Sequence, residues 1–230
     1  LRLSISKYHN FQLVRKIQLN SAFGAIGNEW FRYYDEAIAE AITLSGQLSV
    51  QWVEKDLNQY LNKANGTEDV DYVIAIDTDS VYLNLGPLVS KVMPNEKDEQ
   101  KITQFIDKAS NEAIQKVINK SYDRLAEYTN AYENKMRMKR ESIASSGIWT
   151  AKKRYMLNVR MGEENVYLKV PELKIMGIET ARSSTPEVVR NALKEAISIV
   201  MNKDEHHVHE FVSTFRNVFK SLPPEKIAFP

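Results

Sequence analysis

Residues 73–83, VIAIDTDSVYL, place two aspartates one residue apart inside a run of apolar and β-branched side chains. Such runs are typical of strands, whereas Asp, Thr and Ser are typical of turns. The stretch therefore predicts a tight hairpin over about 71–85, with Asp77 and Asp79 between its strands. Carboxylates on alternate residues of an extended chain point to the same face. The pair either holds a divalent cation through hard oxygen ligands or is a polar turn.

On either side of this hairpin, helical and strand patterns alternate. Apolar spacings of three and four residues predict helices, and short β-branched or aromatic runs between turn residues predict the strands of an antiparallel meander. The expected fold is α+β: an antiparallel sheet, with the hairpin packed on long helices. The predicted helices are 4–26, 35–64, 97–131, 186–202 and 205–221; the predicted meander strands are 135–145, 148–159 and 165–170, with breaks at Ser146–Gly147 and Gly162–Glu163, and a short strand follows at 173–179.

The chain has 230 residues, a formal net charge of +1, 43% hydrophobic residues and no cysteine. This composition is ordinary for a globular protein, and it excludes disulfide frameworks and thiolate metal sites. No apolar run approaches the roughly 20 residues that cross a bilayer, so we expect a cytosolic protein with no membrane partner. The chain begins at Leu1 rather than Met, which predicts a piece of something longer.

One face of the first predicted helix combines several residues suited to a nucleotide. Lys16, Asn20, Phe23, Gly24 and Gly27 fall at successive turns. An ammonium can meet phosphate, a flat ring can pack on a base or sugar, and glycine admits close approach. Taken alone, the stripe favours the simpler interpretation, an ordinary amphipathic helix whose glycines ease helix contact.

A basic segment lies in the predicted meander. It contains one acid, Glu141, and the aromatic residues Trp149 and Tyr155 lie within or beside it. Basic and aromatic side chains together favour contact with a phosphate backbone, and a solvated basic face is the alternative. Its cations are Lys135, Arg137, Lys139, Arg140, Lys152, Lys153 and Arg154.

Four segments in this order resemble the family B DNA polymerases. KIQLNSAFG is similar to motif B of the fingers, and AEAITLSGQ to the segment that follows it. DTDSVY is similar to motif C of the palm hairpin, and KKRY to a motif that contacts the primer end. FRYYD, KIMGIET and SSTP are similar to the T-even-type phage branch. The resemblance implies the end of the fingers over 1–28, palm over 29–177 and the start of the thumb over 178–230.

The resemblance also implies a catalytic role for the aspartates. Asp79 would bind two magnesium ions, which manganese can replace, with Asp77 as its companion, and Glu141 would lie beside this metal site. These groups would support in-line attack of a primer 3′-hydroxyl on the α-phosphate of an incoming dNTP, which is template-directed nucleotidyl transfer in DNA replication.

Nucleotide and DNA contacts follow from the same resemblance. Lys16 would hold the triphosphate, Asn20 and Phe23 would line the nascent base pair, and Gly24 belongs to the same nucleotide-binding face. The resemblance implies two sets of primer-template contacts. In KKRY, Lys153 and Tyr155 would reach the primer terminus and the minor groove. The full sets are Lys152, Lys153, Arg154 and Tyr155 in KKRY, and Arg182, Ser183 and Ser184 on the duplex backbone.

Two departures from the family pattern matter. Phe23 replaces the commoner tyrosine, and the sequence has no D-x-x-S-L-Y-P-S stretch, the motif A that carries another metal-binding aspartate. The chain is therefore expected not to polymerise alone. It would need an N-terminal polymerase portion that bears motif A and the exonuclease. A sliding clamp would bind through a C-terminal region absent from this chain, and the host cytoplasm would be the location for a phage enzyme.

Two other classes of function remain open from the residues. YVIAIDTDSVY also fits the D-x-D-x-[TV] nucleophile motif of haloacid-dehalogenase-type phosphatases, although the later acidic pattern of that class is missing. A non-catalytic nucleic-acid-binding module would use only the basic segment. The cluster EHHVHE at 205–210 is interpreted as solvated histidines on a helix rather than as metal ligands.

Overall fold

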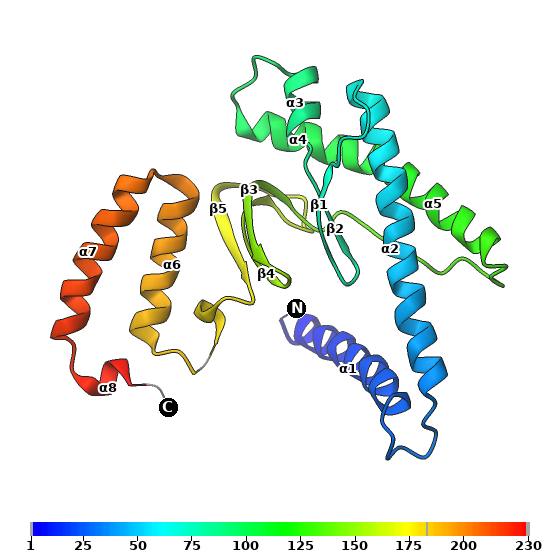
Figure 1. Cartoon of the computed structure of the whole chain (residues 1–230), viewed down its shortest axis with the longest axis horizontal. Helices are drawn as coiled ribbons and strands as arrows, with labels where there is room; N and C mark the ends of the chain where they lie inside the picture. Colours follow the sequence, from blue (N-terminus) through cyan, green and yellow to red (C-terminus); the bar gives the residue numbers. More distant parts are fainter. Residues whose placement is uncertain (1, 183, 229–230) are drawn as a thin grey trace.

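The computed structural model describes residues 2–182 and 184–228 of the chain (Figure 1). Helices and two small antiparallel sheets make up an α+β fold, as the sequence predicts. In chain order the elements are α1 (Arg2–Ile26), α2 (Glu36–Asn65), β1 (Val73–Asp77), β2 (Ser80–Leu83), α3 (Gly86–Val92), α4 (Glu99–Ala109), a π-helical turn (Ser110–Ile114), α5 (Gln115–Tyr128), β3 (Ile143–Ala151), β4 (Arg154–Met161), β5 (Tyr167–Met176), a short 3₁₀ helix (Glu179–Ala181), α6 (Glu187–Asn202), α7 (Glu205–Ser221) and α8 (Pro224–Ile227).

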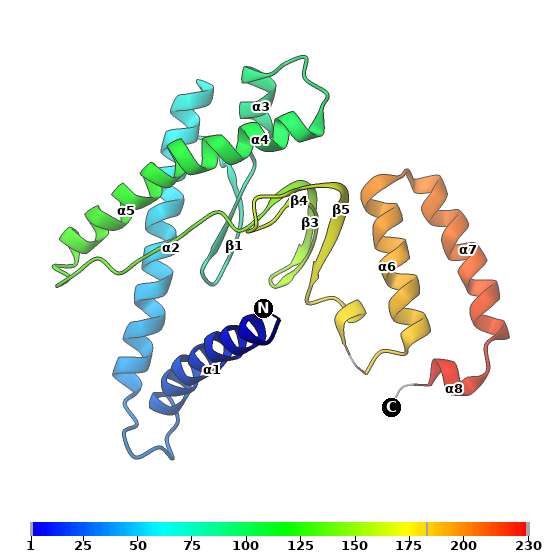
Figure 2. The same cartoon turned by 180° about the vertical axis from the view of Figure 1, so that it is seen from behind.

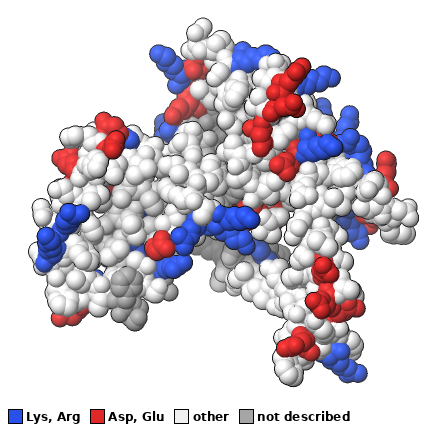
Figure 3. Space-filling model, in the orientation of Figure 1, with Lys and Arg blue, Asp and Glu red and all other residues white. Residues whose placement is uncertain are grey.

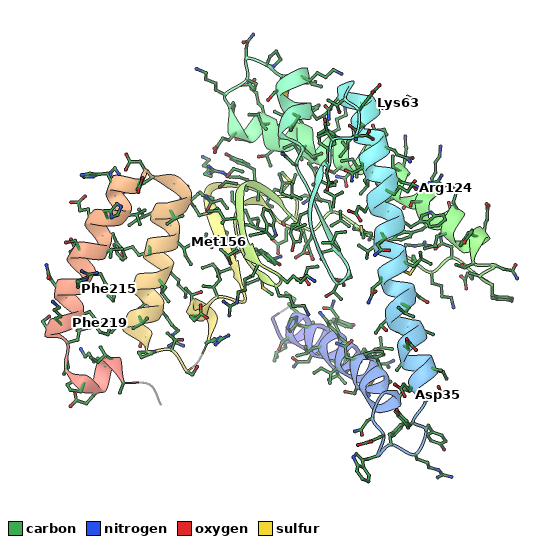
Figure 4. All side chains as sticks on the ribbon, in the orientation of Figure 1. Asp35, Lys63, Arg124, Met156, Phe215 and Phe219 are labelled. Atoms are coloured by element: carbon green, nitrogen blue, oxygen red, sulfur yellow. The ribbon has the colours of Figure 1, made fainter. Side chains whose placement is uncertain are left out.

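Helix α2, with 30 residues, is the longest helix in the described parts of the chain, and its ends are set by capping residues. The Asp35 side chain accepts a hydrogen bond from the backbone N–H of Ile38, which satisfies a free donor of the first turn. At the other end Gly66 adopts a φ of 73°, the left-handed conformation that commonly ends helices. Figure 4 labels Asp35 and Lys63 near these two ends. The helix predicted over 35–64 is confirmed, and it ends at Asn65, immediately before Gly66.

The main core lies between the second half of α2 and helix α5. Val53 and Leu57 of α2 are buried against Ile118, Tyr122 and Leu125 of α5. Their spacing of three and four residues places them on one face of each helix. An ion pair between Arg124 and Asp56 joins the same two helices at the surface; Figure 4 labels Arg124 on α5. This helix pair supports the hairpin formed by β1 and β2.

The helix predicted over 97–131 is formed as two α-helices joined by a π-helical turn. Helix α4 begins after Asp98, whose side chain accepts from the N–H of Gln100. The π turn, Ser110–Ile114, directs the following helix onto α2, and Ile114 is buried in the core. Helix α3 was not predicted, because its seven residues are too few to show a clear period.

The strands form two separate antiparallel sheets, one of β1 and β2 and one of β3, β4 and β5 (Figures 1 and 2). The predicted break at Ser146–Gly147 is wrong: Gly147 lies inside β3, opposite Leu157. A Cβ at position 147 would lie 2.6 Å from Leu157 Cδ2 and 2.8 Å from the Trp149 ring. Close packing, and not a turn, therefore explains this glycine.

The β3–β4 turn falls instead at Lys152 and Lys153, between Ala151 and Arg154. The predicted separation of 165–170 from 173–179 is also wrong, because β5 runs continuously through Pro171. Proline is tolerated there since β5 is an edge strand of its sheet.

Helices α6 and α7 form a hairpin beside the three-stranded sheet (Figures 1 and 2). Asn158 of β4 is 3% exposed, and its Nδ2 donates to Ser146 Oγ and to Asn202 Oδ1, each at 3.1 Å. This amide contact fixes the end of α6 to the sheet. Helix α7 carries Phe215 and Phe219, labelled in Figure 4, whose ring centroids are 5.8 Å apart.

None of the helices in the described parts of the chain is long and apolar enough to cross a membrane.

Candidate functional site at two hairpin turns

The acidic turn joins β1 and β2. Asp77 is paired with Ser80, which leaves Thr78 and Asp79 as a two-residue loop. Thr78 has a φ of 54°, a conformation that a β-branched residue rarely adopts and that often marks functional sites. Its Oγ1 donates to Asp77 Oδ1 at 3.1 Å, and Ser80 Oγ donates to Asp79 Oδ1 at 3.5 Å. Asp79 is exposed, and Asp77 is half-buried.

The basic turn joins β3 and β4 through Lys152 and Lys153, and both residues are exposed together with Arg154. Lys153 has a φ of 60°. Gly177 packs against it: a Cβ at Gly177 would lie 1.9 Å from the Lys153 carbonyl oxygen, and Gly177 itself has a φ of 67°. Arg154 also pairs with Glu179 at 3.7 Å. Figure 3 shows Lys and Arg side chains gathered in the middle of this face, at the position of the turn in Figure 1.

An aromatic cluster connects the two turns. The ring of Tyr82, on β2, lies 5.3 Å from those of Trp149 and Tyr155, measured between centroids. Burial is the main cause that raises the pKa of Tyr82 above its ordinary value, followed by the Tyr155 hydroxyl and then the carboxylates of Glu141 and Asp77. The charges of both acids therefore act on the Tyr82 hydroxyl. Tyr155 is only 5% exposed, so this structure places its ring in the protein core rather than on an open surface.

A cleft of about 1180 Å³ runs between the helices and the three-stranded sheet, beside the acidic turn. Asp79, Glu141 and Lys174 line it, whereas Asp77 is not among the described residues that do. Glu141 Oε1 lies 2.5 Å from Nζ of Lys174 on β5. The structure thus brings Asp79 and Glu141, which are 62 positions apart in sequence (141 minus 79), to one cleft.

The carboxylates fit one side of a magnesium site and not a whole one. Asp77 and Asp79 offer the hard oxygen ligands that magnesium prefers. Within residues 2–182 and 184–228, however, no group of three or more Asp, Glu, His or Cys side chains is placed to hold a metal ion.

The histidine-rich segment is not such a group. His207 Nδ1 lies 2.6 Å from Asp204 Oδ1, and His209 Nε2 lies 3.4 Å from Glu205 Oε1. The hydrogen bond from His207 is the main cause that lowers the pKa of Asp204. These contacts are local to the first turns of α7, as expected for solvated histidines on a helix.

The predicted nucleotide-binding residues lie on α1. Lys16, Asn20, Phe23 and Gly24 are all exposed, and no heavy atom lies within 4 Å of a Cβ built at Gly24. Helix α1 has no buried residue among those described, so its stripe is open to a ligand or to a further part of a protein. Its N-terminal end lies near the two hairpin turns in both views (Figures 1 and 2).

The predicted duplex contacts near 182–184 are described in part. Arg182 follows the 3₁₀ helix and is exposed, and Ser184 is exposed as well. Ser183 lies outside the described residues.

The topology overturns the phosphatase interpretation. A haloacid-dehalogenase-type site needs a helical crossover after its aspartate strand, but β1 turns directly into the antiparallel strand β2. Sequence reasoning missed Lys174 and the packing role of Gly177. Both lie in the KIMGIET segment. A lysine and a glycine at the end of an otherwise apolar strand are unusual there, and this could have indicated their roles from the sequence.

Comparison with known proteins identifies relatives of nearly the whole chain. A protein of Enterobacteria phage T4, named DNA-directed DNA polymerase, is 40% identical over 226 residues, which are 94% of this chain and 25% of the relative. A protein of the same name from Escherichia phage RB69 is 42% identical over 203 residues, 84% of this chain and 22% of the relative. No protein-family model matches the chain. The chain therefore spans about a quarter of the length of these relatives. Over that span the chain is similar to a segment of these two phage DNA polymerases, and the predicted resemblance to the T-even-type phage branch is confirmed.

Proposed function

We propose that this chain is the palm-centred part of a replicative DNA-directed DNA polymerase, with residues 1–28 ending the fingers, 29–177 forming the palm and 178–230 starting the thumb. The observation that carries the proposal is the pairing of an acidic turn with a basic turn through one aromatic cluster. Carboxylates suit metal ions and lysines suit phosphates, and nucleotidyl transfer to a primer needs both within reach of one another.

In this proposal Asp79, with Asp77, holds magnesium, or manganese in its place. When bound, two such ions would activate the primer 3′-hydroxyl and stabilise the charge that develops on the phosphate. The protein residues fix the position of the ligands: the two-residue turn ends a rigid hairpin, and Tyr82 anchors that hairpin on Trp149 and Tyr155. Glu141 contributes negative charge at the rim of the same cleft.

The nucleotide would bind along α1 and the primer-template at the basic turn. Lys16 would pair with the triphosphate of the dNTP, while Asn20, Phe23 and Gly24 would lie against the nascent base pair. Lys152, Lys153 and Arg154 are exposed cations suited to the primer backbone. Tyr155 would act from beneath the turn, since its ring is buried. Arg182, Ser183 and Ser184 would contact the duplex. DNA synthesis would take place in the cytoplasm of the host cell.

The active site would be completed by another polypeptide portion that bears motif A and the exonuclease, and a sliding clamp would bind outside this chain.

The experiment is primer extension with the 230-residue chain alone, and with an added N-terminal piece of a related polymerase. Extension is expected only in the second reaction. Robust extension by the chain alone would contradict the proposed incomplete site, whereas DNA binding without extension in either reaction would favour a non-catalytic binding module.

A further inference from the structure

The cleft beside the acidic turn contains a lysine, Lys174, that the sequence motifs leave without a role. Its Nζ lies 2.5 Å from Glu141 Oε1. Lys174 lies on β5 opposite Leu157 of β4, and its side chain is 32% exposed, against 55% for Glu141. Because Lys174 lines the same cleft as Asp79, a fixed cation shares the space in which a metal ion is proposed to bind.

The backbone on both sides of Glu141 is anchored, so the fold determines where its side chain enters the cleft. Arg140 Nε lies 2.8 Å from Asp107 Oδ1, and Arg140 Nη1 donates to the Gly162 carbonyl oxygen at 3.1 Å. Ile143, two residues after Glu141, is 6% exposed. Glu141 is thus held between two fixed points, with its carboxylate toward β5.

The ion pairs around the cleft divide into two groups. Arg140 and Arg160 pair with Asp107 and Glu99, which are acids of α4, and these contacts join the helix layer to the sheet. Lys174 instead pairs with Glu141, an acid of the proposed site. The charge of Lys174 therefore changes the electrostatic potential at the proposed site, whereas the two arginines hold α4 against the sheet side of the cleft.

We propose that Lys174 is a positioning residue that holds the Glu141 carboxylate against β5 and competes for it with a divalent cation. This inference rests on the proposed function, because it takes Asp79 as a metal ligand. An ion pair between partly exposed groups is weak, so a divalent ion held by several carboxylates displaces the ammonium. Glu141 then turns to the metal only when the remaining ligands are in place, which links metal binding to assembly of the whole site.

The test is a Mn²⁺ titration of the 230-residue chain, followed by paramagnetic broadening of its backbone amide NMR signals. We expect Lys174→Met to tighten the apparent Mn²⁺ affinity about fivefold, because one positive charge leaves the cleft. Broadening should also extend from the Asp79 turn to the amides of Glu141 and Ser142. Lys174→Arg keeps the charge and should match the wild type. Lys169→Met is the matched control, since Lys169 is an exposed lysine of the same strand outside the cleft lining.

The outcomes separate this inference from the function on which it rests. Unchanged or weaker Mn²⁺ affinity in Lys174→Met, at an unchanged melting temperature, would overturn the inference. If that variant melts earlier, Lys174→Gln replaces it with the same expected gain. Loss of binding in Asp79→Asn supports the proposed metal site whatever Lys174→Met does. Broadening that survives Asp79→Asn would overturn both. Absence of broadening in both the wild type and Lys174→Met would overturn the inference alone, because the proposed function already expects an incomplete site in this chain.

Discussion

The acidic and the basic turn have the same length and opposite charge, and they are held in different ways. The acidic turn is stabilised from within, by hydrogen bonds between side chains of adjacent residues such as Thr78 and Asp77. The basic turn is held from outside, because Gly177 packs against the Lys153 carbonyl and Glu179 pairs with Arg154. Each turn contains one non-glycine residue with positive φ, the first loop residue in one and the second in the other.

In the proposed function, this difference would suit two different ligands, a phosphate backbone and a metal ion. A phosphate backbone is a long, repeating target, and a turn whose shape is fixed in advance can present lysines to it at little entropic cost. A metal site instead collects ligands from several segments, so the proposed site would keep its turn on a rigid hairpin and leave only the exposed carboxylate side chain of Asp79 free to adjust to the other ligands. The aromatic cluster then fixes the relative position of the two turns, so in the proposed function they would face one substrate.

Removing the acidic charge should give the largest effect. With an added portion that bears motif A, Asp79→Asn is expected to lower primer extension by about a thousandfold, because one neutral amide replaces a metal ligand. The melting temperature should stay unchanged, since Asp79 is exposed. Asp69→Asn is the matched control, since Asp69 is an exposed aspartate that precedes β1 and lies away from the turn. Extension assays on both variants check this, and near-normal extension by Asp79→Asn would contradict the assigned role.

Removing the outside support of the basic turn should give the next largest effect. Gly177→Ala places a methyl group against the Lys153 carbonyl at a left-handed φ, so the free energy of unfolding is expected to fall by about 3 kcal/mol. Urea unfolding followed by circular dichroism measures it. Gly162→Ala is the control, because no heavy atom lies within 4 Å of a Cβ built there. Equal stability of the two variants would show that the close approach is not needed.

Breaking the link between the turns should have a moderate effect. Tyr82→Leu removes two edge-to-face contacts while it keeps an apolar side chain, and is expected to cost about 1–2 kcal/mol of unfolding free energy. Tyr132→Leu, at a fully exposed position, should cost almost nothing. Thermal unfolding of both variants tests this. A Tyr82→Leu variant as stable as the wild type would mean that the turns are joined by other contacts.

Removing the basic charge should give the smallest effect. The double variant Lys152→Gln and Lys153→Gln is expected to weaken binding to a primer-template severalfold and to reduce the slope of log affinity against log salt by about 2. Fluorescence anisotropy at several salt concentrations measures both quantities. The matched control changes Lys97 and Lys116, two exposed lysines of the helix layer, to Gln. An equal loss in the control would indicate a general charge effect rather than contact at the turn.

Patterns of apolar residues predict most of the elements of this fold, and the errors have physical causes. The Asn65–Gly66 stop and the hairpin around Asp77 and Asp79 follow from local backbone preferences, which the sequence expresses directly. Gly147 was misread because its reason is tertiary: the Leu157 side chain and the Trp149 ring occupy the space of a Cβ.

The same distinction applies to the site. Motif spacing predicts the acids and the KKRY lysines, because those residues adjoin one another in sequence. It does not predict that the lysines form the turn itself, that Tyr155 is buried, or that Lys174 meets Glu141. These three features depend on how β3, β4 and β5 pair with one another, and the sequence of one segment does not determine that pairing register. The assigned roles of Lys16 and its neighbours on α1 stay predictions.

The position of Trp149 gives the molecule a natural optical reporter. Its indole is packed between Tyr82 and Tyr155, where the two hairpins meet. The other two tryptophans differ, since Trp30 is 87% exposed and Trp52 lies against Tyr128 and the core between α2 and α5. In a chain with phenylalanine at positions 30 and 52, tryptophan fluorescence would thus come from Trp149 alone, where the two hairpins meet. Its fluorescence would follow any movement of the acidic turn against the basic one without an attached dye.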